Sequence, residues 1–140
     1  MMLNQGRDKG VYIGQPVVDS NGLIGNIISV NKFNSSLLLV TDPANAVPVE
    51  NLRNGLRGIA IGIGESDILT LQHMPITADI KVGDKFVTSG LGGRYPKGYP
   101  IGIVSYVHDT KNRKFLDISI KPSANLESSN IVLILPKKAD

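Results

Sequence analysis

One strand-turn-strand phrase occurs twice in this chain, and the repeat constrains the fold more than any other feature. The first copy reads IGQPVVDS at residues 13–20 and continues as IGNIISV at residues 24–30. The second copy reads VGDKFVTS at residues 82–89 and continues as IGIVSYV at residues 101–107. Because a repeated sequence unit indicates a repeated structural unit, we expect two small β modules of related build.

The remaining sequence also favours β structure. Valine and isoleucine total 28 residues against six alanines, and β-branched side chains pack well on a pleated surface. No segment carries apolar residues at helical spacing over two turns with capping residues at both ends. The pattern predicts strands over residues 16–19, 23–32, 36–41, 46–50, 57–63, 67–72, 85–89, 101–108, 114–121 and 130–135.

The predicted fold class is all-β, with two small tandem β-barrels, or barrel-like sheets, related by the internal repeat. Pro75 is disfavoured inside a central strand, so we place the module boundary there. The first module then spans residues 1–75 and the second spans residues 76–140. Thr41, Asp42 and Pro43 are predicted to form a structural turn, because proline fixes φ at the second turn position.

The second copy of the repeat carries an insertion, GLGGRYPKGYP, at residues 90–100. Proline lowers the entropy that a loop loses on docking, and tyrosine and arginine are favoured interface anchors. This pattern predicts a rigid, exposed protein-binding loop, although its apolar side chains would also suit closure of the second barrel. The predicted contact residues are Leu91, Arg94, Tyr95 and Tyr99, and the residues predicted to shape the loop are Gly90, Gly92, Gly93, Pro96, Gly98, Pro100 and Gly102.

The sequence gives little support for catalysis. The chain has no cysteine, and its two histidines, His73 and His108, lack the spacing of metal ligands. We therefore expect no metal and no cofactor. A serine hydrolase built from Ser89, one histidine and Asp117 stays a remote alternative, because a triad is defined by geometry rather than by sequence order. The glycine-rich insertion also lacks the ending of a phosphate-binding loop.

Charge leaves one further alternative open. Residues 1–75 carry a net charge of −1 and residues 76–140 a net charge of +4. The second half is therefore compatible with a β-barrel module that binds nucleic acid or an anionic wall polymer. The basic residues form no stripe interleaved with aromatic residues, so we expect no nucleic-acid partner.

Several long motifs resemble one bacterial family. TSGLGGRYPKGYPIG at residues 88–102 resembles the signature of the MreC-type rod shape-determining proteins. The resemblance spans roughly residues 4–136, and a series of long motifs in order is more specific than any one of them. The other motifs that carry it are GVYIGQPV at 10–17, LLVTDP at 38–43, AVPV at 46–49, RNGLRG at 53–58 and ADIKVGD at 78–84.

This resemblance implies a fold and a location. Members of the family have a short cytoplasmic tail, a membrane helix, a coiled coil and an extracytoplasmic two-barrel β domain. The chain resembles this last portion, so residues 1–9 are expected to be the stub that follows a missing coiled coil. The expected location is the periplasmic or extracytoplasmic side of the inner membrane, as part of a membrane-anchored protein.

The resemblance also implies a function and partners. It implies a non-enzymatic scaffold of the cell-elongation machinery, which organises peptidoglycan synthesis and maintains rod cell shape. The expected partners are a class B penicillin-binding transpeptidase, MreD, the SEDS glycosyltransferase and, indirectly, MreB. Self-association of the full-length protein is expected as well.

Overall fold

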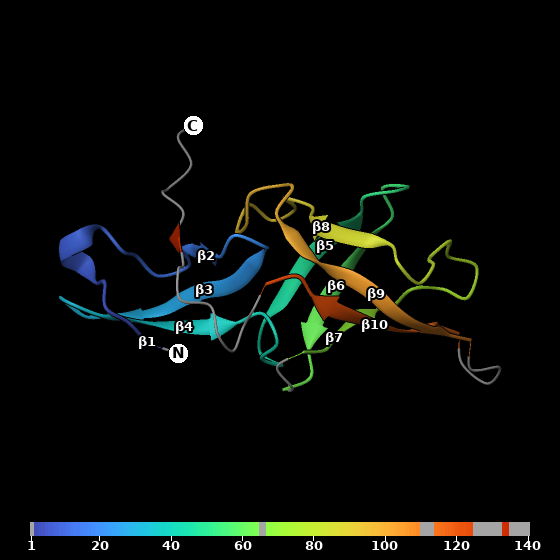
Figure 1. The fold of residues 1–140 in the computed structure, drawn as a ribbon, viewed down its shortest axis with the longest axis horizontal. Helices are drawn as coiled ribbons and strands as arrows, with labels where there is room; N and C mark the ends of the chain where they lie inside the picture. Colours follow the sequence, from blue (N-terminus) through green and yellow to red (C-terminus); the bar gives the residue numbers. More distant parts are fainter. Residues whose placement is uncertain (1, 65–66, 110–113, 125–132, 135–140) are drawn as a thin grey trace.

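A computed structural model describes residues 2–64, 67–109, 114–124 and 133–134. Across these residues the regular structure is β, apart from the 3-10 helix η1 at Arg7–Lys9 (Figure 1). The strands are β1 (Met2–Leu3), β2 (Pro16–Val18), β3 (Leu23–Val30), β4 (Ser35–Leu39), β5 (Ala46–Asn51), β6 (Arg57–Gly62), β7 (Leu69–Gln72), β8 (Lys85–Thr88), β9 (Pro100–His108), β10 (Asp117–Pro122) and β11 (Leu133–Ile134).

The strands form two units that lie side by side along the long axis of the molecule (Figure 1). One unit is a five-stranded antiparallel sheet in the order β1-β4-β3-β2-β11. The other is a closed barrel in the order β10-β7-β6-β5-β8-β9. The all-β prediction with two β units is confirmed, as one closed barrel and one open sheet.

The predicted boundary at residue 75 does not separate these units. Strands β5, β6 and β7 precede that residue, yet they belong to the barrel together with β8, β9 and β10. The physical reason is that a three-stranded meander leaves two edges unpaired. Pairing of β5 with β8 and of β7 with β10 satisfies both edges and closes the barrel. At the other end of the chain, β11 returns to the open sheet beside β2.

The internal repeat is visible as matched backbone geometry. Gly14 and Gly83 both have positive φ, 92° and 96°. The amide of Gly14 donates to the carbonyl of Ile27 at 2.7 Å, and the amide of Gly83 donates to that of Val104 at 2.8 Å. Ile27 and Val104 occupy the same place in the two copies. The backbone turn at the start of the first strand is therefore the same in both copies, although the copies lie in different units.

A second pair of repeat glycines explains why the neighbouring strands pack closely. A Cβ atom at Gly25 would overlap the carbonyl oxygen of Leu38, and one at Gly102 would overlap that of Lys121. Gly102 was predicted to shape the insertion, but it lies within β9. Glycine is required at position 102 because β10 approaches closely, not because the loop needs a special backbone conformation there.

Most predicted strands agree with the structure to within two residues at each end. The predicted strand over 114–121 begins only at Asp117, and β1 and η1 were not predicted. The predicted strand over 130–135 lies largely outside the described residues, which include only Leu133 and Ile134 of it. Strands of two or three residues are too short to show an alternation of apolar and polar residues. Sequence patterns therefore predict such segments and the ends of strands poorly.

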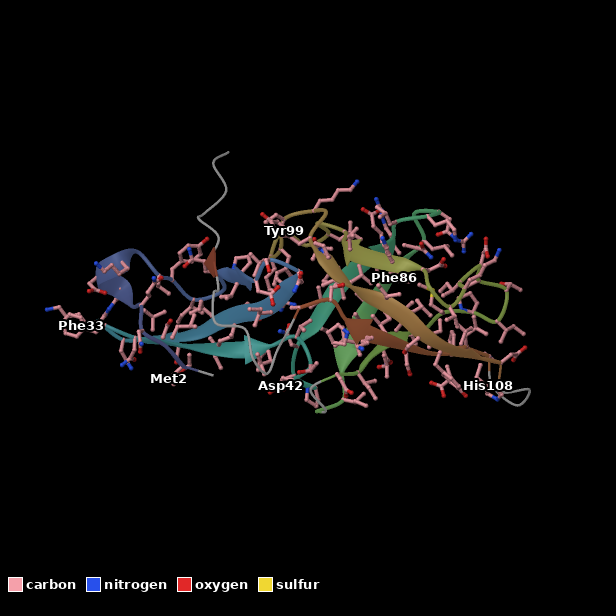
Figure 2. The ribbon with its side chains drawn as sticks, in the orientation of Figure 1. Met2, Phe33, Asp42, Phe86, Tyr99 and His108 are labelled. Carbon is pink, nitrogen blue, oxygen red and sulfur yellow. The ribbon has the colours of Figure 1, made fainter. Side chains whose placement is uncertain are left out.

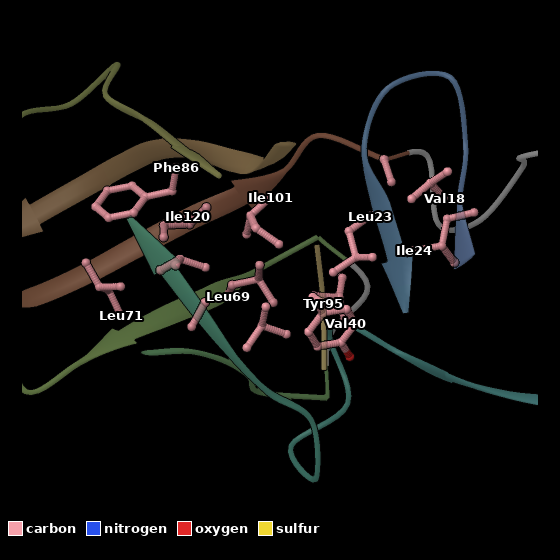
Figure 3. Close-up of a cluster of buried hydrophobic side chains, with 14 of the residues drawn as sticks. Val18, Leu23, Ile24, Val40, Leu69, Leu71, Phe86, Tyr95, Ile101 and Ile120 are labelled. Atoms are coloured by element: carbon pink, nitrogen blue, oxygen red, sulfur yellow. The ribbon is translucent and has the colours of Figure 1, made fainter. Parts of the chain in front are cut away.

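A continuous apolar core joins the two units. Barrel side chains such as Phe86, Leu69 and Ile120 are fully buried, as is Ile24 of the open sheet. Figure 3 shows Tyr95 between the barrel group and the side chains at the edge of the sheet. The sheet and the barrel therefore share one core, and neither buries its apolar face alone.

We expect Gly25→Ala to destabilise the domain by roughly 2–3 kcal/mol, because the new methyl group forces two paired strands apart. Ser29→Ala, at an exposed position of the same strand, is the matched control. Urea denaturation followed by circular dichroism measures both changes. Equal stabilities for the two variants would contradict the close-approach explanation.

Candidate functional site

The loop between β8 and β9 is held at its base by one threonine. The backbone amide of Thr88 donates to the carbonyl of Tyr99 at 2.8 Å, and the amide of Gly98 donates back to Thr88 at 2.8 Å. The Thr88 hydroxyl donates to the carbonyl of Pro96 and accepts from the amide of Tyr99. Buried Thr88 thus ties the returning end of the loop to the strand from which the loop leaves.

Glycines set the path between these fixed ends. The positive φ values are 80° at Gly90, 77° at Gly92, 71° at Gly93 and 97° at Gly98. Only glycine adopts these conformations without strain, so each position gives the chain a turn that other residues resist. The amide of Gly93 also donates to the carbonyl of Gly90 at 3.2 Å, which closes a tight turn at the start of the loop.

Tyr95 was predicted to be a partner-contact residue of an exposed loop, with closure of the second barrel as the alternative, and its burial agrees with the alternative. The residue is only 3% exposed. Its hydroxyl lies 2.8 Å from Oδ1 of Asn26 and 3.2 Å from Oδ1 of Asn45, and it can donate its proton to either oxygen. Asn45 also donates from Nδ2 to Oδ1 of Asn26 at 3.0 Å. We call Tyr95, Asn26 and Asn45 the junction triad.

The junction triad links three parts of the fold. Asn26 lies on β3 of the open sheet, Asn45 immediately precedes β5 of the barrel, and Tyr95 belongs to the loop. Burial raises the pKa of the Tyr95 phenol, and the positive charge of Arg94 partly offsets this shift. The phenol therefore remains a neutral hydrogen-bond donor in the interior, where an unpaired polar group would be costly.

Two of the predicted contact residues do face solvent. Leu91 is 48% exposed, and the guanidinium of Arg94 is exposed while it lies 4.8 Å from the centroid of the Tyr95 ring. Arg94 also donates from Nη2 to the backbone carbonyl of Ala46. Tyr99 is partly buried and packs against the core. Leu91 and Arg94, together with Lys97, thus form the exposed part of the loop, and Tyr95 and Tyr99 hold it in place.

The turn at Thr41, Asp42 and Pro43 positions Asn45 for the junction triad. The amide of Asn45 donates to the carbonyl of Asp42 at 2.9 Å, and the Asp42 carboxylate accepts from the amide of Ala44 at 2.9 Å. Pro43 takes the second position of this turn, where its fixed φ is favourable. The turn places Asn45 with its side chain buried beside Asn26.

The sequence analysis missed an ion-pair cluster at the opposite end of the barrel. Arg53 donates from Nε and Nη2 to the two carboxylate oxygens of Asp84, both at 2.9 Å, and from Nη1 to Asp79 at 3.0 Å. Asn51 and the amide of Lys81 also donate to Asp84. The cluster joins the turn between β5 and β6 to the segment before β8. Arg53 lies in the RNGLRG motif, and Asp79 and Asp84 lie in the ADIKVGD motif. Neither motif predicts by itself that the two segments are in contact.

Hydrogen bonds from Arg53 lower the pKa of both Asp84 and Asp79, and these carboxylates raise the pKa of Arg53. The cluster is therefore charged throughout the neutral range. The cluster lies away from the loop, and four donors from three residues satisfy the buried Asp84 carboxylate, so we assign the cluster a structural role.

The serine-hydrolase alternative gains no support from the described residues. Ser89 is 7% exposed, and its hydroxyl accepts a hydrogen bond from the amide of Leu91. His73 packs edge-on against Phe115, and His108 stacks on Tyr106, so the described contacts join neither histidine to Ser89. The described part of the chain also holds no group of three or more metal-ligating side chains.

Comparison with known proteins identifies the family. The family model described as rod shape-determining protein MreC, barrel core, matches residues 1–136. The chain is 46% identical to the cell shape-determining protein MreC of Haemophilus influenzae over 135 residues, which are 96% of this chain and 38% of that protein. The chain belongs to the MreC family.

Solved MreC structures share the fold. The crystal structure of MreC from Pseudomonas aeruginosa matches with a TM-score of 0.92 and 42% identity, over 96% of this chain and 86% of that chain. A complex between penicillin-binding protein PBP2 and MreC from Helicobacter pylori matches with a TM-score of 0.67 and 23% identity, over 84% of this chain and 73% of that chain. At that identity, the second match supports the fold alone.

The chain spans less than half the length of the Haemophilus influenzae MreC, which it matches over 38% of that protein. Across the described ranges, no helix is both long enough and apolar enough to span a membrane. The geometry described above is therefore that of the family's barrel core.

We expect Tyr95→Phe to destabilise the domain by about 1–2 kcal/mol, because it removes the hydroxyl donor from buried Oδ1 of Asn45 and leaves Oδ1 of Asn26 with Asn45 Nδ2 as its donor. Tyr99→Phe is the matched control, since it removes a hydroxyl from a partly buried tyrosine of the same loop. Urea unfolding measures both variants. A loss no greater for Tyr95→Phe than for Tyr99→Phe would contradict the role of the junction triad.

The Arg53 cluster predicts acid sensitivity. Asp84 and Asp79 have lower pKa values in the folded state than in the unfolded state, where an aspartate titrates near ~3.9. The unfolded state therefore binds protons first, and stability falls as the pH drops below about 4. We expect Asp84→Asn to flatten the fall in unfolding free energy between about pH 4 and pH 2. Asp67→Asn, at an exposed position, should leave the slope unchanged.

Proposed function

We propose that this MreC domain is a non-enzymatic scaffold that holds a partner of the cell-elongation machinery on the exposed part of the β8–β9 loop. The observation that carries the proposal is a fixed loop that exposes two of the predicted contact residues. Leu91 supplies apolar area and Arg94 supplies a cation. A loop already held by Thr88 and the junction triad loses little entropy on docking, so its contacts contribute fully to affinity.

Arg94 suits a partner contact for a second reason. Its guanidinium already lies over the Tyr95 ring, so its position is partly fixed before a partner arrives. Arginine in such a position offers its remaining N–H donors to carboxylates or carbonyl groups. A partner surface with an apolar pocket beside an acidic or carbonyl-rich rim would complement the Leu91 and Arg94 side chains.

The partner that we propose first is a class B penicillin-binding transpeptidase. The support is membership of the MreC family, one member of which, from Helicobacter pylori, has been solved in complex with the penicillin-binding protein PBP2. By the family's organisation we also propose MreD and the SEDS glycosyltransferase as partners, an indirect link to MreB, and self-association of the whole protein. The corresponding location is the extracytoplasmic face of the inner membrane, for which the solved major periplasmic domain of a related MreC is the support.

A binding role agrees better with the loop than a catalytic one does. The exposed side chains of the loop are Leu91, Arg94 and Lys97. An aliphatic side chain and a guanidinium do not act as nucleophiles, and the Lys97 ammonium pairs with the Glu50 carboxylate at 3.6 Å. The nearby hydroxyls of Thr88 and Ser89 are buried and bonded to loop backbone. These hydroxyls therefore act in holding the loop.

Calorimetric titration of the domain against the extracytoplasmic domain of the elongation transpeptidase from the same organism tests the proposal. We expect saturable binding that Leu91→Ala and Arg94→Ala each weaken by roughly tenfold or more. The control is Phe33→Ala, because Phe33 is also an exposed apolar residue and lies at the far end of the open sheet (Figure 2). Absence of binding, or an affinity that both loop variants leave unchanged, would overturn the proposal.

A further inference from the structure

The barrel wall opens at one seam, between β7 and β10. The two strands pair at Leu69 with Ile120 and at Thr70 with Ser119, and the described ladder then stops. The strands meet again where the amide of Leu116 donates to the carbonyl of Met74 at 2.7 Å. Three residues, 71–73, therefore face two residues, 117–118, across the opening.

The extra residue in this opening is strained. His73 has a φ of 59°, and it is the one residue other than glycine with positive φ in the described chain. Such a conformation costs about 1–3 kcal/mol and is concentrated at functional sites. The interruption of the ladder between β7 and β10 therefore carries an energetic cost at His73. A regular ladder would not require this backbone conformation.

The opening forms a groove of about 470 Å3. Leu71 and Ile118 also line it, but both belong to the core and are almost fully buried, so they offer little surface to a ligand. Its rim carries Gln72, His73, Lys114, Phe115 and Asp117. The volume lies in the range of small-molecule sites, and the accessible lining combines one exposed aromatic ring with several polar groups.

Two aromatic rings shape one side of the groove. The His73 and Phe115 rings pack edge to face, with centroids 5.5 Å apart, and Phe115 is 43% exposed. Gln72 donates from Nε2 to the hydroxyl of Thr70 at 3.1 Å. This bond fixes the carboxamide and leaves its oxygen as an acceptor for a ligand hydroxyl.

We propose that this groove binds a neutral saccharide unit. A pyranose ring has an apolar C–H face, which suits the exposed Phe115 ring, and a hydroxyl edge, which suits the amide and charged groups of the rim. Among the described residues that line the groove, Lys114 and Asp117 supply opposite charges that balance, which favours a neutral ligand over a polyanion. The paired residues at both ends of the seam leave no continuous strand edge for a peptide to extend.

This inference is independent of the proposed partner surface, because the groove is lined by β7, by β10 and by the residues just before β10 rather than by the β8–β9 loop. Failure of one proposal therefore leaves the other intact. The ligand class is defined by its chemistry, a hydroxyl-rich ring with one apolar face.

Nuclear magnetic resonance titration of the 15N-labelled domain tests the inference, with cellotriose and triacetylchitotriose as probes. The titration runs to roughly 10 mM, because small open sites commonly bind weakly. We expect saturable amide shifts at Gln72, His73, Phe115 and Asp117 with at least one of the two sugars. Phe115→Ala and Gln72→Ala should each weaken that binding by roughly tenfold.

The matched control is Tyr106→Ala, which removes an exposed aromatic ring from β9 outside the groove and should leave the affinity unchanged. Two variants of the rim keep the test informative if one of them fails to fold. No saturable shift with either sugar would overturn the inference. An affinity that the folded rim variants leave unchanged would overturn it as well.

Discussion

The hydrogen bonds of Tyr95 with Asn26 and Asn45 are the interaction on which the rest of this structure depends. They lie where the open sheet, the barrel and the β8–β9 loop meet. Buried polar groups of this kind stabilise one arrangement only, because any displacement leaves an unpaired donor or acceptor in the interior. The junction triad therefore fixes the position of the sheet relative to the barrel and the position of the loop relative to both.

The exposed surface of the loop follows from this constraint. The ring of Tyr95 supports the guanidinium of Arg94, and the base of the loop is closed by Thr88. Leu91 and Arg94 then face solvent from a backbone that glycines have already turned. The residues that bind a partner in our proposal are few, and most of the motif at residues 88–102 serves to hold them in position.

Sequence reasoning recovers the repeat because its glycines act locally, within one strand and its immediate neighbour. Gly14 and Gly83 need positive φ, and Gly25 and Gly102 allow close strand approach. The burial of Tyr95 is not recoverable in this way, because Asn26 and Asn45 lie 69 and 50 residues away in the chain. The pairing of β5 with β8 is also non-local. The sequence pattern of a glycine- and proline-rich loop does not predict whether an aromatic residue in it faces solvent or the core.

The most direct test of the junction triad measures the distance between the two units. The chain has no cysteine, so Ser29→Cys on β3 and Ser105→Cys on β9 give two unique spin-label sites at exposed positions. Double electron–electron resonance should give one narrow distance distribution for this pair and a clearly broader one after Tyr95→Phe is added. A distribution that is broad in both proteins, or equally narrow in both, would contradict a triad that holds the sheet and barrel together.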